Sequence, residues 1–381
     1  MKMQTEAPGG IAGKHRPRIL ISGGGTGGHI FPALSIAEEL RDKLDAEILF
    51  VGAAGRMEMT RVPEAGYKII GLPVAGFDRK HPLKNISVLV KLYSSMKKAR
   101  KIIKEFNPEI VIGVGGYASG PVLKAAQKVG IPTLIQEQNS YAGVTNKLLA
   151  KQADAICVAY DNMDRFFPAK SIVKTGNPIR QRLLNENMTR KEALESFGLS
   201  SDRKTLLVVG GSLGALTINE SLEKNIKDLA GKNIQVIWQT GKNFGNRGPE
   251  VCKGLKGVVV TPFISDMAAA YRSADLVISR AGAASISELQ ALGKPAILVP
   301  SPNVAEDHQT HNAMALVNRG AAVMIKDADA RNKLVPEALN LLSQPEKLAE
   351  MSKNISSMAI TDSAARIGKE VCRILKDSKK H

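Results

Sequence analysis

The feature that most constrains the fold is a strand, glycine turn and helix unit that occurs twice. In each copy a β-branched run leads into a glycine-rich turn and then a helical stretch: Ile19–Ser22, Gly23–Gly28 and Pro32–Leu44, then Leu206–Val209, Gly210–Gly214 and Thr217–Leu229. Such a unit opens the parallel sheet of a Rossmann-like domain, because glycines permit the tight turn between strand and helix. Two copies predict an α/β chain of two Rossmann-like, doubly wound domains that face a cleft.

The remaining pattern alternates strands and helices, which is typical of parallel sheets covered by helices. The strands expected along the chain, including those of the two units above, are Arg18–Ser22, Glu47–Gly52, Ile110–Val114, Thr133–Gln136, Ala155–Ala159, Ile172–Thr175, Thr205–Val209, Gln235–Gln239, Val258–Thr261, Leu276–Ser279 and Ala296–Val299. The length of 381 residues agrees with two domains at roughly 150 residues each. We expect a loose arm (1–16), a first domain (17–177) and a second domain (178–360). The last helix, within about 361–381, is open to either domain, and we place it on the first.

Composition excludes several classes of protein. The three cysteines lie far apart, which rules out a disulfide framework or a Cys-rich zinc site and suits a reducing cytosol. No apolar run reaches the ~18 residues that span a bilayer, and the start lacks the apolar core of a signal peptide. The net charge of +17 predicts a polyanionic partner. Nucleic acid is not favoured, because aromatic residues make up only 4% and no nucleic-acid-binding motif is present.

Much of the positive charge falls in one stretch, Arg79–Lys104, which holds nine Lys and Arg residues and no acid. Helical spacing predicts that one apolar stripe packs inward: Leu89, Leu92, Tyr93, Met96, Ile103 and Phe106. Four further apolar residues fall partly off this stripe: Leu83, Ile86, Val90 and Ile102. A basic helix with spare apolar residues suits an anionic membrane surface, and a solvated basic face on an ordinary helix explains the same pattern.

Four strand-to-helix junctions are rich in small residues: Gly23–Gly28, Gly113–Gly120, Gly210–Gly214 and Ser279–Ala284. Backbone N–H groups in such turns can approach a phosphate closely, so four of them favour phosphate binding over mere turning. None carries the GK[ST] of a P-loop. The first matches the dinucleotide fingerprint, but the next strand ends in Phe50–Ala53 without the acid that holds a ribose, so NAD is disfavoured.

Individual polar residues at these junctions suggest chemistry. His29 follows the first turn at a helix start, where the helix N-terminus can lower its pKa and make it a base; capping or filling space is the alternative. Gln136–Asn139 ends a strand at the edge where ligands bind, although a plain polar loop looks the same. Glu288 can accept hydrogen bonds from two ribose hydroxyls, or serve only the helix dipole.

One pair of histidines and one pair of aspartates are of the residue types that bind metal ions. His308 and His311 lie three residues apart, but no carboxylate-rich cluster completes a metal site, so polar contacts to a ligand are favoured. Asp327 and Asp329 form a nominal DxD motif, which we discount because it lies late in a polar loop. No metal and no cofactor are expected.

Taken in order, the motifs resemble those of the MurG family of peptidoglycan N-acetylglucosaminyltransferases. The matching segments are Gly24–Ala33, Gly115–Pro121, Glu137–Asn139, Thr175–Arg180, Gly210–Ala215, Ser279–Glu288 and Asp307–Ala313. The resemblance implies a GT-B fold and metal-independent, inverting transfer of GlcNAc from UDP-GlcNAc to lipid I, undecaprenyl-pyrophosphoryl-MurNAc-pentapeptide. The product would be lipid II with a β-1,4 bond. It also implies a peripheral enzyme on the cytoplasmic face of the inner membrane, docked through Arg79–Lys104, with other cell-wall synthesis proteins as further partners.

The resemblance also assigns roles to residues. It implies catalytic roles for His29, as the base, and for Glu137, and acceptor contacts for Tyr117, Ser119 and Gly120. UDP-GlcNAc would contact Thr26, Gly27, Gly28, Asn139, Arg180, Ser212, Ile264, Ala283, Ala284, Ser285, Ile286, Ser287, Glu288 and Gln309. The segment Pro302–Ala305 leaves the choice between His308 and Gln309 open. The alternatives are a UDP-GlcNAc 2-epimerase, a diacylglycerol hexosyltransferase of the same fold, and a non-enzymatic binder of sugar nucleotides or nucleic acid.

Overall fold

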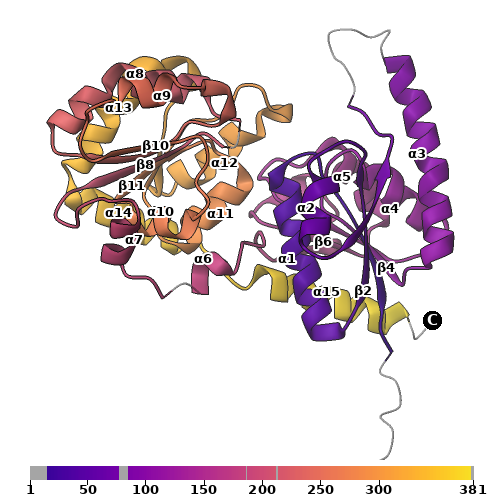
Figure 1. Ribbon diagram of the computed structural model, residues 1–381. Helices are drawn as coiled ribbons and strands as arrows, with labels where there is room; N and C mark the ends of the chain where they lie inside the picture. Colours follow the sequence, from indigo (N-terminus) through magenta and orange to yellow (C-terminus); the bar gives the residue numbers. More distant parts are fainter. Residues whose placement is uncertain (1–14, 77–84, 186, 212, 379–381) are drawn as a thin grey trace, which may run out of the picture.

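The computed structural model describes residues 15–76, 85–185, 187–211 and 213–378, which form two α/β lobes (Figure 1). Most of the expected arm (1–14), Ser212 and the first basic residues of the charged stretch, Arg79, Lys80 and Lys84, lie outside the described residues. The expectation of two parallel-sheet domains is confirmed, because the strands form one sheet of seven and one of six.

The first sheet has the order β3-β2-β1-β4-β5-β6-β7, and its neighbouring strands pair in parallel. Its strands are β1 (Arg18–Ser22), β2 (Glu47–Ala53), β3 (Lys68–Leu72), β4 (Ile110–Gly113), β5 (Thr133–Glu137), β6 (Ala155–Val158) and β7 (Ile172–Lys174). Central strands such as β4 and β5 are buried along their whole length, because helices cover both faces of the sheet.

The second sheet has the order β10-β9-β8-β11-β12-β13, which repeats the order of the first six strands of the first sheet. Its strands are β8 (Thr205–Val209), β9 (Gln235–Gln239), β10 (Val258–Thr261), β11 (Leu276–Ser279), β12 (Ala296–Leu298) and β13 (Ala322–Met324). Successive side chains of β8 enter opposite cores: Leu206 and Val208 face one hydrophobic cluster, and Leu207 faces the other. The domain is therefore doubly wound, with a core on each face of the sheet.

Helices cover both faces of each sheet (Figure 1). They are α1 (Gly27–Leu44), α2 (Glu58–Glu64), α3 (Asn85–Phe106), α4 (Ser119–Lys128), α5 (Val144–Leu149), α6 (Arg182–Asn185), α7 (Arg190–Ser196), α8 (Leu216–Gly231), α9 (Arg247–Val251), α10 (Met267–Ser273), α11 (Ala283–Ala291), α12 (His308–Val317), α13 (Ala330–Leu342), α14 (Pro345–Ser356) and α15 (Ser363–Ser378). None of those described is long and apolar enough to cross a membrane.

The chain crosses between the lobes twice, and the two crossings touch. A Cβ atom on Gly176 would lie 2.6 Å from Ser363 Oγ and 2.8 Å from Ile360 Cβ, so only glycine fits at that point. After the second crossing, α15 packs against α1 of the first domain, and Ile367 and Val371 enter the same core as Ile36. The last helix thus ties the end of the chain to the lobe where the chain begins.

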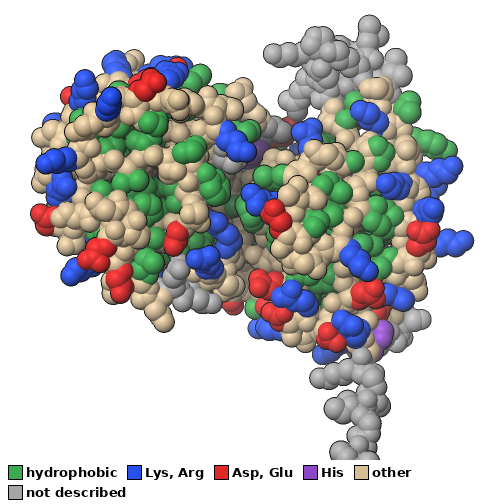
Figure 2. Space-filling view, in the orientation of Figure 1, with side chains coloured by type: hydrophobic (Ala, Val, Ile, Leu, Met, Phe, Trp, Pro, Cys, Tyr) green, Lys and Arg blue, Asp and Glu red, His purple; other side chains and the backbone are tan. Residues whose placement is uncertain are grey.

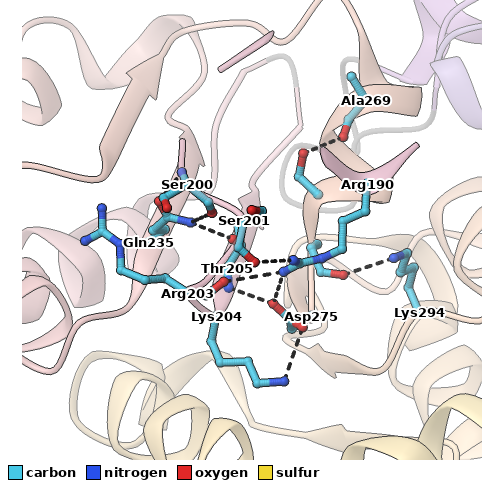
Figure 3. A network of polar contacts seen from close by, with 12 residues as sticks. Arg190, Ser200, Ser201, Arg203, Lys204, Thr205, Gln235, Ala269, Asp275 and Lys294 are labelled. Carbon is cyan, nitrogen blue, oxygen red and sulfur yellow. Dashed lines mark hydrogen bonds and ion pairs between the residues drawn. The ribbon is translucent and has the colours of Figure 1, made fainter. Parts of the chain in front are cut away.

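The amino ends of the second sheet carry a charged network that holds helix α7 to the sheet (Figure 3). Arg190 binds Asp275 at 2.7 Å, and the same carboxylate accepts from the Thr205 N–H at 2.8 Å. Lys294 donates to the Ala274 carbonyl at 3.0 Å, and burial lowers its pKa to about 8. These charged side chains bind other groups of the second domain, and they lie at the edge of the sheet opposite to the carboxyl ends of the strands.

The apolar stripe expected on the basic helix is confirmed at Ile103, which is buried, and at Phe106, which packs against the same core, but it is wrong for its first three residues. In α3, Leu89, Leu92 and Tyr93 are exposed (55%, 40% and 76%), as is Val90 at 65%. The buried side of the helix is built from Val88, Ser95, Ala99, Ile102 and Ile103. The small side chains of Ser95 and Ala99 let the helix approach its neighbours closely, while the large apolar residues from Leu89 to Tyr93 stay outside.

Candidate functional site

The carboxyl ends of the two sheets face each other, and the surface is hollowed between the lobes (Figure 2). The lobes are joined there by Asn312 of α12, which is fully buried. Its Oδ1 accepts from the Ser140 N–H at 2.9 Å, and its Nδ2 donates to Asn139 Oδ1 at 3.1 Å and to the Ala281 carbonyl at 3.3 Å. One amide therefore aligns the loop after β5 with the turn after β11.

A second amide makes the same kind of junction where the chain first crosses. Asn177 donates to the Gln138 carbonyl and to Ser287 Oγ, each at 3.0 Å, and accepts from Gln136 Nε2 at 3.0 Å. Ser287 lies on α11 of the second domain, so this residue links the polar end of β5 to the expected donor site. The polar run Gln136–Asn139 therefore forms part of the interface between the domains.

His29 lies in the first turn of α1, where Thr26 is the N-cap residue. Its Nδ1 is 3.1 Å from the Gly24 carbonyl and 3.2 Å from Thr26 Oγ1. A carbonyl can only accept, so in the neutral ring Nδ1 carries the proton and Nε2 keeps its lone pair. Burial lowers the pKa of His29, with Glu137 and the Gly24 hydrogen bond opposing the shift and His308 adding to it.

The turn after β4 makes room for this imidazole. A Cβ atom on Gly115 would lie 2.9 Å from His29 Nε2 and 2.8 Å from Cδ2, and this residue has φ +93°. Glycine is needed here both for the backbone and for the approach of the ring. The first two small-residue turns of the chain therefore meet around His29.

Glu137, at the end of β5, is 2% exposed and fully engaged. One oxygen accepts from the N–H and the Nδ2 of Asn139 at 3.0 and 3.2 Å. The other accepts from the Gly143 N–H at 3.0 Å and Asn146 Nδ2 at 2.8 Å. This carboxylate orders the loop that leads to the domain interface.

Glu288 forms a buried cluster on the other wall. Its Oε1 accepts from Arg180 Nε and Nη2 at 3.0 and 2.8 Å, and its Oε2 accepts from the Tyr271 hydroxyl at 3.1 Å. Burial raises the pKa of Glu288, while Arg180 and Tyr271 counteract the shift. The guanidinium of Arg180 also lies 5.7 Å from the ring centroid of Phe31 on α1, so the cluster reaches the first domain.

The remaining residues predicted to contact the donor lie at the start of α11, in the core of the second domain and at the start of α12. Ala283, Ala284 and Ser285 open α11, with its backbone N–H groups at the cleft edge. The side chain of Ile286 is fully buried and that of Ile264 is 3% exposed, both in the core, so only their backbones are available to a ligand. The Ile264 N–H is already bound to Gln239 Oε1 at 3.2 Å. Gln309, in the first turn of α12, accepts from the Ser301 N–H at 2.9 Å.

The predicted acceptor residues lie in and directly after the turn that follows β4, whose Gly115 packs against His29. Tyr117 is 60% exposed, and its hydroxyl lies against Gly76. Ser119 is buried and donates to the Gly116 carbonyl at 2.9 Å, so its hydroxyl closes the turn. Gly120 packs against Thr145 of α5, where a Cβ atom would lie 3.2 Å from Cγ2.

Asp327 of the discounted DxD motif is part of an ion pair. It binds Arg280 Nη1 and Thr217 Oγ1, while Arg280 Nη1 also donates to the Val299 and Pro300 carbonyls at 3.1 and 3.2 Å. The group connects the ends of three strands to the first turn of α8. Across the described ranges, no three His, Cys, Asp or Glu side chains lie close enough together to hold a metal ion.

The contacts made by several residues of this site could not be predicted from the sequence. Asn312 and Asn177 stood inside recognised motifs, but nothing in the sequence indicated that each would bridge the domains. Tyr271 gave no signal, because an aromatic residue in a helix is usually core. Glu58 was not predicted either: it is an acid that is only 1% exposed, and it lies in a helix that the periodicity did not predict.

Two parallel α/β domains, joined at the carboxyl ends of their strands by polar side chains, define a GT-B-type glycosyltransferase fold. Residues 19–158 match the glycosyltransferase family 28 N-terminal domain, and residues 205–367 match the C-terminal domain of the same family. The chain belongs to glycosyltransferase family 28.

Named relatives agree with this assignment. The chain is 60% identical over 366 residues, 95% of this chain and 96% of the other, to the UDP-N-acetylglucosamine--N-acetylmuramyl-(pentapeptide) pyrophosphoryl-undecaprenol N-acetylglucosamine transferase of Bacteroides fragilis. The crystal structure of MurG from Acinetobacter baumannii superposes with a TM-score of 0.77 at 28% identity, covering 94% of this chain and 99% of that one.

A UDP-N-acetylglucosamine 2-epimerase structure shares the fold as well. Its TM-score is 0.68 at 15% identity, over 94% of this chain and 95% of that one. At that identity the likeness concerns the fold alone, so the fold does not separate a transferase from an epimerase. That distinction depends on sequence identity and on the chemistry of the cleft.

Proposed function

We propose that this chain transfers GlcNAc from UDP-GlcNAc to undecaprenyl-pyrophosphoryl-MurNAc-pentapeptide, forming lipid II with a β-1,4 bond and inversion, without a metal. The observation that carries the proposal is the 60% identity to a transferase of that name, extending over nearly the whole of both chains. The cleft supports it, because the first domain contributes a histidine whose pKa is lowered by burial, and the second contributes a carboxylate and arginine cluster that reaches Phe31 of α1.

The proposed chemistry follows from the hydrogen bonds of His29. Its Nδ1–H donates to the Gly24 carbonyl, which leaves Nε2 to take the proton of the acceptor hydroxyl as that oxygen attacks the anomeric carbon. The attack comes from the face opposite to the departing UDP, which inverts the configuration. Burial keeps the pKa of His29 below its ordinary 6.5, so the ring is a free base at neutral pH.

The second domain would hold UDP-GlcNAc. Glu288 is placed to accept hydrogen bonds from ribose hydroxyls, once they replace one of its present donors, Arg180 or Tyr271. The turn Gly210–Gly214 leads into α8, whose N-terminus attracts negative charge and would steady the leaving diphosphate. In the first domain, the four hydrogen bonds of Glu137 suit a positioning role better than proton transfer.

The acceptor is a lipid, and we assign helix α3 as the surface that meets its membrane. Leu89, Val90 and Tyr93 are exposed beside Lys97 and Lys101, and along the right-hand edge of Figure 2 hydrophobic and basic side chains lie side by side over this helix. Apolar side chains can enter the headgroup region while each nearby lysine adds about 1 kcal/mol of attraction to anionic lipid. Lys98 is not part of this surface, because it donates to the Gly71 carbonyl at 2.7 Å.

The reaction is tested by product analysis. Purified protein, UDP-GlcNAc and a lipid I analogue in EDTA should yield the disaccharide lipid and UDP in equal amounts, and the coupling constant of the new anomeric proton should report a β bond. Formation of UDP-ManNAc without acceptor would instead indicate the epimerase. Use of diacylglycerol as acceptor would indicate the glycolipid synthase.

The membrane surface is tested separately with vesicles that contain anionic lipid. Leu89→Ser with Tyr93→Ser, and Lys97→Glu with Lys101→Glu, should each reduce sedimentation with the vesicles. Val129→Ser is the matched control, since that side chain is 61% exposed but lies on another part of the first domain. Equal binding by all variants would contradict the assignment of α3.

A further inference from the structure

A buried carboxylate lies beneath the glycine turn that carries His29. Glu58, the first residue of α2, is 1% exposed. Its Oε1 accepts from the Ala53 N–H at 2.9 Å, and its Oε2 accepts from the Gly25 N–H at 3.0 Å. The side chain therefore connects the end of β2 to the turn between β1 and α1.

The surrounding glycines make space for this side chain. A Cβ atom on Gly24 would lie 2.1 Å from Glu58 Oε1, and one on Gly52 would lie 2.6 Å from its Cγ. Both contacts are impossible for a larger residue unless Glu58 moves. Part of the glycine content of this turn thus accommodates a protein carboxylate, and the Gly25 N–H is not free to bind a phosphate.

The same peptide group joins Glu58 to His29. The Gly25 N–H that donates to Glu58 and the Gly24 carbonyl that accepts from His29 Nδ1, at 3.1 Å, belong to one peptide unit. Hydrogen bonds in a chain polarise one another, so a negative charge at the N–H end makes the carbonyl a better acceptor. Carboxylate, peptide group and imidazole therefore form a single line of hydrogen bonds.

We propose that Glu58 is a positioning residue that acts on His29 through the Gly24–Gly25 peptide group. It fixes the turn and strengthens the acceptor for Nδ1–H, which holds the ring in the tautomer whose Nε2 is free. The peptide group takes the place that a carboxylate next to the histidine would otherwise occupy. The role in catalysis rests on the proposed function of His29 as the base, but the effect on the imidazole does not.

The primary test is Glu58→Gln. The Ala53 and Gly25 N–H groups bind different oxygens of Glu58, so in glutamine one of them would meet the NH2 group, which cannot accept. We expect kcat to fall about 100-fold, as is typical when a reacting group is misplaced by about 1 Å, with the KM for UDP-GlcNAc unchanged. Glu64→Gln is the matched control, because Glu64 lies on the same helix, is exposed and pairs with Arg61.

Dependence on His29 is tested by a double mutant. If Glu58 acts through the imidazole, Glu58→Gln should cause no further loss of residual transfer in a His29→Ala background. Independent losses that multiply would contradict the proposal, because they would indicate a general structural effect.

A spectroscopic test needs no activity at all. With 15N-labelled histidine, His29 in the unaltered protein should show a protonated Nδ1 and an unprotonated Nε2, assigned by comparison with His29→Ala. Glu58→Gln should increase the other tautomer at least several-fold. An unchanged tautomer in a folded Glu58→Gln protein would overturn the proposal, whatever reaction the enzyme catalyses.

The pH dependence has a defined sign. The charged or titratable groups that face His29 are Glu58 from α2, Glu137 from β5 and His308 from α12, and the negative charge of Glu58 raises the pKa of His29. Removing that charge should lower the pKa further, so the acidic limb of kcat/KM should move to lower pH while the plateau falls. A limb that stays in place or moves to higher pH would contradict the proposal.

A second variant guards against misfolding of the first. Gly52→Ala keeps the carboxylate but presses on Glu58 Cγ at 2.6 Å and on Ile69 Cδ1 at 3.1 Å. It should reduce kcat and disturb the tautomer of His29 with a smaller pH shift, because the charge remains. A folded Gly52→Ala protein with unaltered kcat and tautomer would contradict the proposal.

Discussion

The two domains share a strand order, but different side chains lie at their corresponding first turns. In the first domain, the turn after β1 holds Glu58 on its Gly25 N–H and His29 on its Gly24 carbonyl. In the second, the turn after β8 leads into α8, where Thr217 meets the Arg280 and Asp327 ion pair. A carboxylate in the first turn disfavours phosphate and supports a base, whereas the N-terminus of α8, with its partial positive charge, favours a diphosphate. One topology thus supports two kinds of chemistry.

The largest expected difference between the two walls comes from the base. His29→Ala should lower kcat by about 1,000-fold, within the range for loss of a general base, and leave the Kd for UDP-GlcNAc unchanged. Steady-state kinetics and calorimetry measure the two quantities. His15→Ala, on the exposed edge of the same domain, should behave like the unaltered protein. Equal losses of donor affinity and kcat in His29→Ala would contradict the assignment of the base to the first domain and donor binding to the second.

A change on the second wall should act on the donor instead. Glu288→Gln should raise the KM for UDP-GlcNAc about 10- to 100-fold, because hydrogen bonds donated to a charged acceptor contribute about 1.5–3 kcal/mol. The KM for the lipid acceptor should stay the same. Glu250→Gln, at an exposed position of α9, is the control. An effect confined to the acceptor would reverse the roles assigned to the two domains.

The domain interface itself should matter less than either wall. Asn312→Ala leaves the buried Ser140 N–H without its acceptor, which should lower the free energy of unfolding by about 2 kcal/mol. Urea denaturation measures this, with Asn318→Ala at the exposed end of the same helix as the control. No loss of stability would mean that the lobes do not depend on this amide.

The surface ion pair between the lobes should have the smallest effect. Arg319 lies 3.3 Å from Asp161, and both side chains are about half exposed. Arg319→Ala should change stability by at most about 0.5 kcal/mol, and added salt should abolish even that difference. A change as large as that of Asn312→Ala would show that the interface is held by charge rather than by buried amides.

The strands were largely predictable because buried parallel strands are short apolar runs with little ambiguity. β8, β9, β10 and β11 have the expected bounds. β3 and β13 were not predicted, although the other edge strands of the two sheets, β7 and β10, were. Helix α1 begins at Gly27 instead of Pro32, since the turn glycines themselves take helical conformation.

Burial was harder to predict than secondary structure. On α3 Leu89, Leu92 and Tyr93 are outside while Ser95 and Ala99 are inside, because close packing against neighbouring elements at that point selects small side chains. Glu58 could not be identified from sequence, since its position depends on Gly24 of the first turn and Gly52 of β2, which come together only in the fold. The motifs located the site, but the tautomer of His29 required the hydrogen bonds.

The most direct test of the account is UDP release from UDP-GlcNAc in EDTA, with and without a lipid I analogue, for the unaltered protein, His29→Ala and Glu288→Gln. We predict release only with acceptor, its loss in His29→Ala even at saturating donor, and its recovery at high UDP-GlcNAc in Glu288→Gln. Release without acceptor, or full release by His29→Ala, would contradict it.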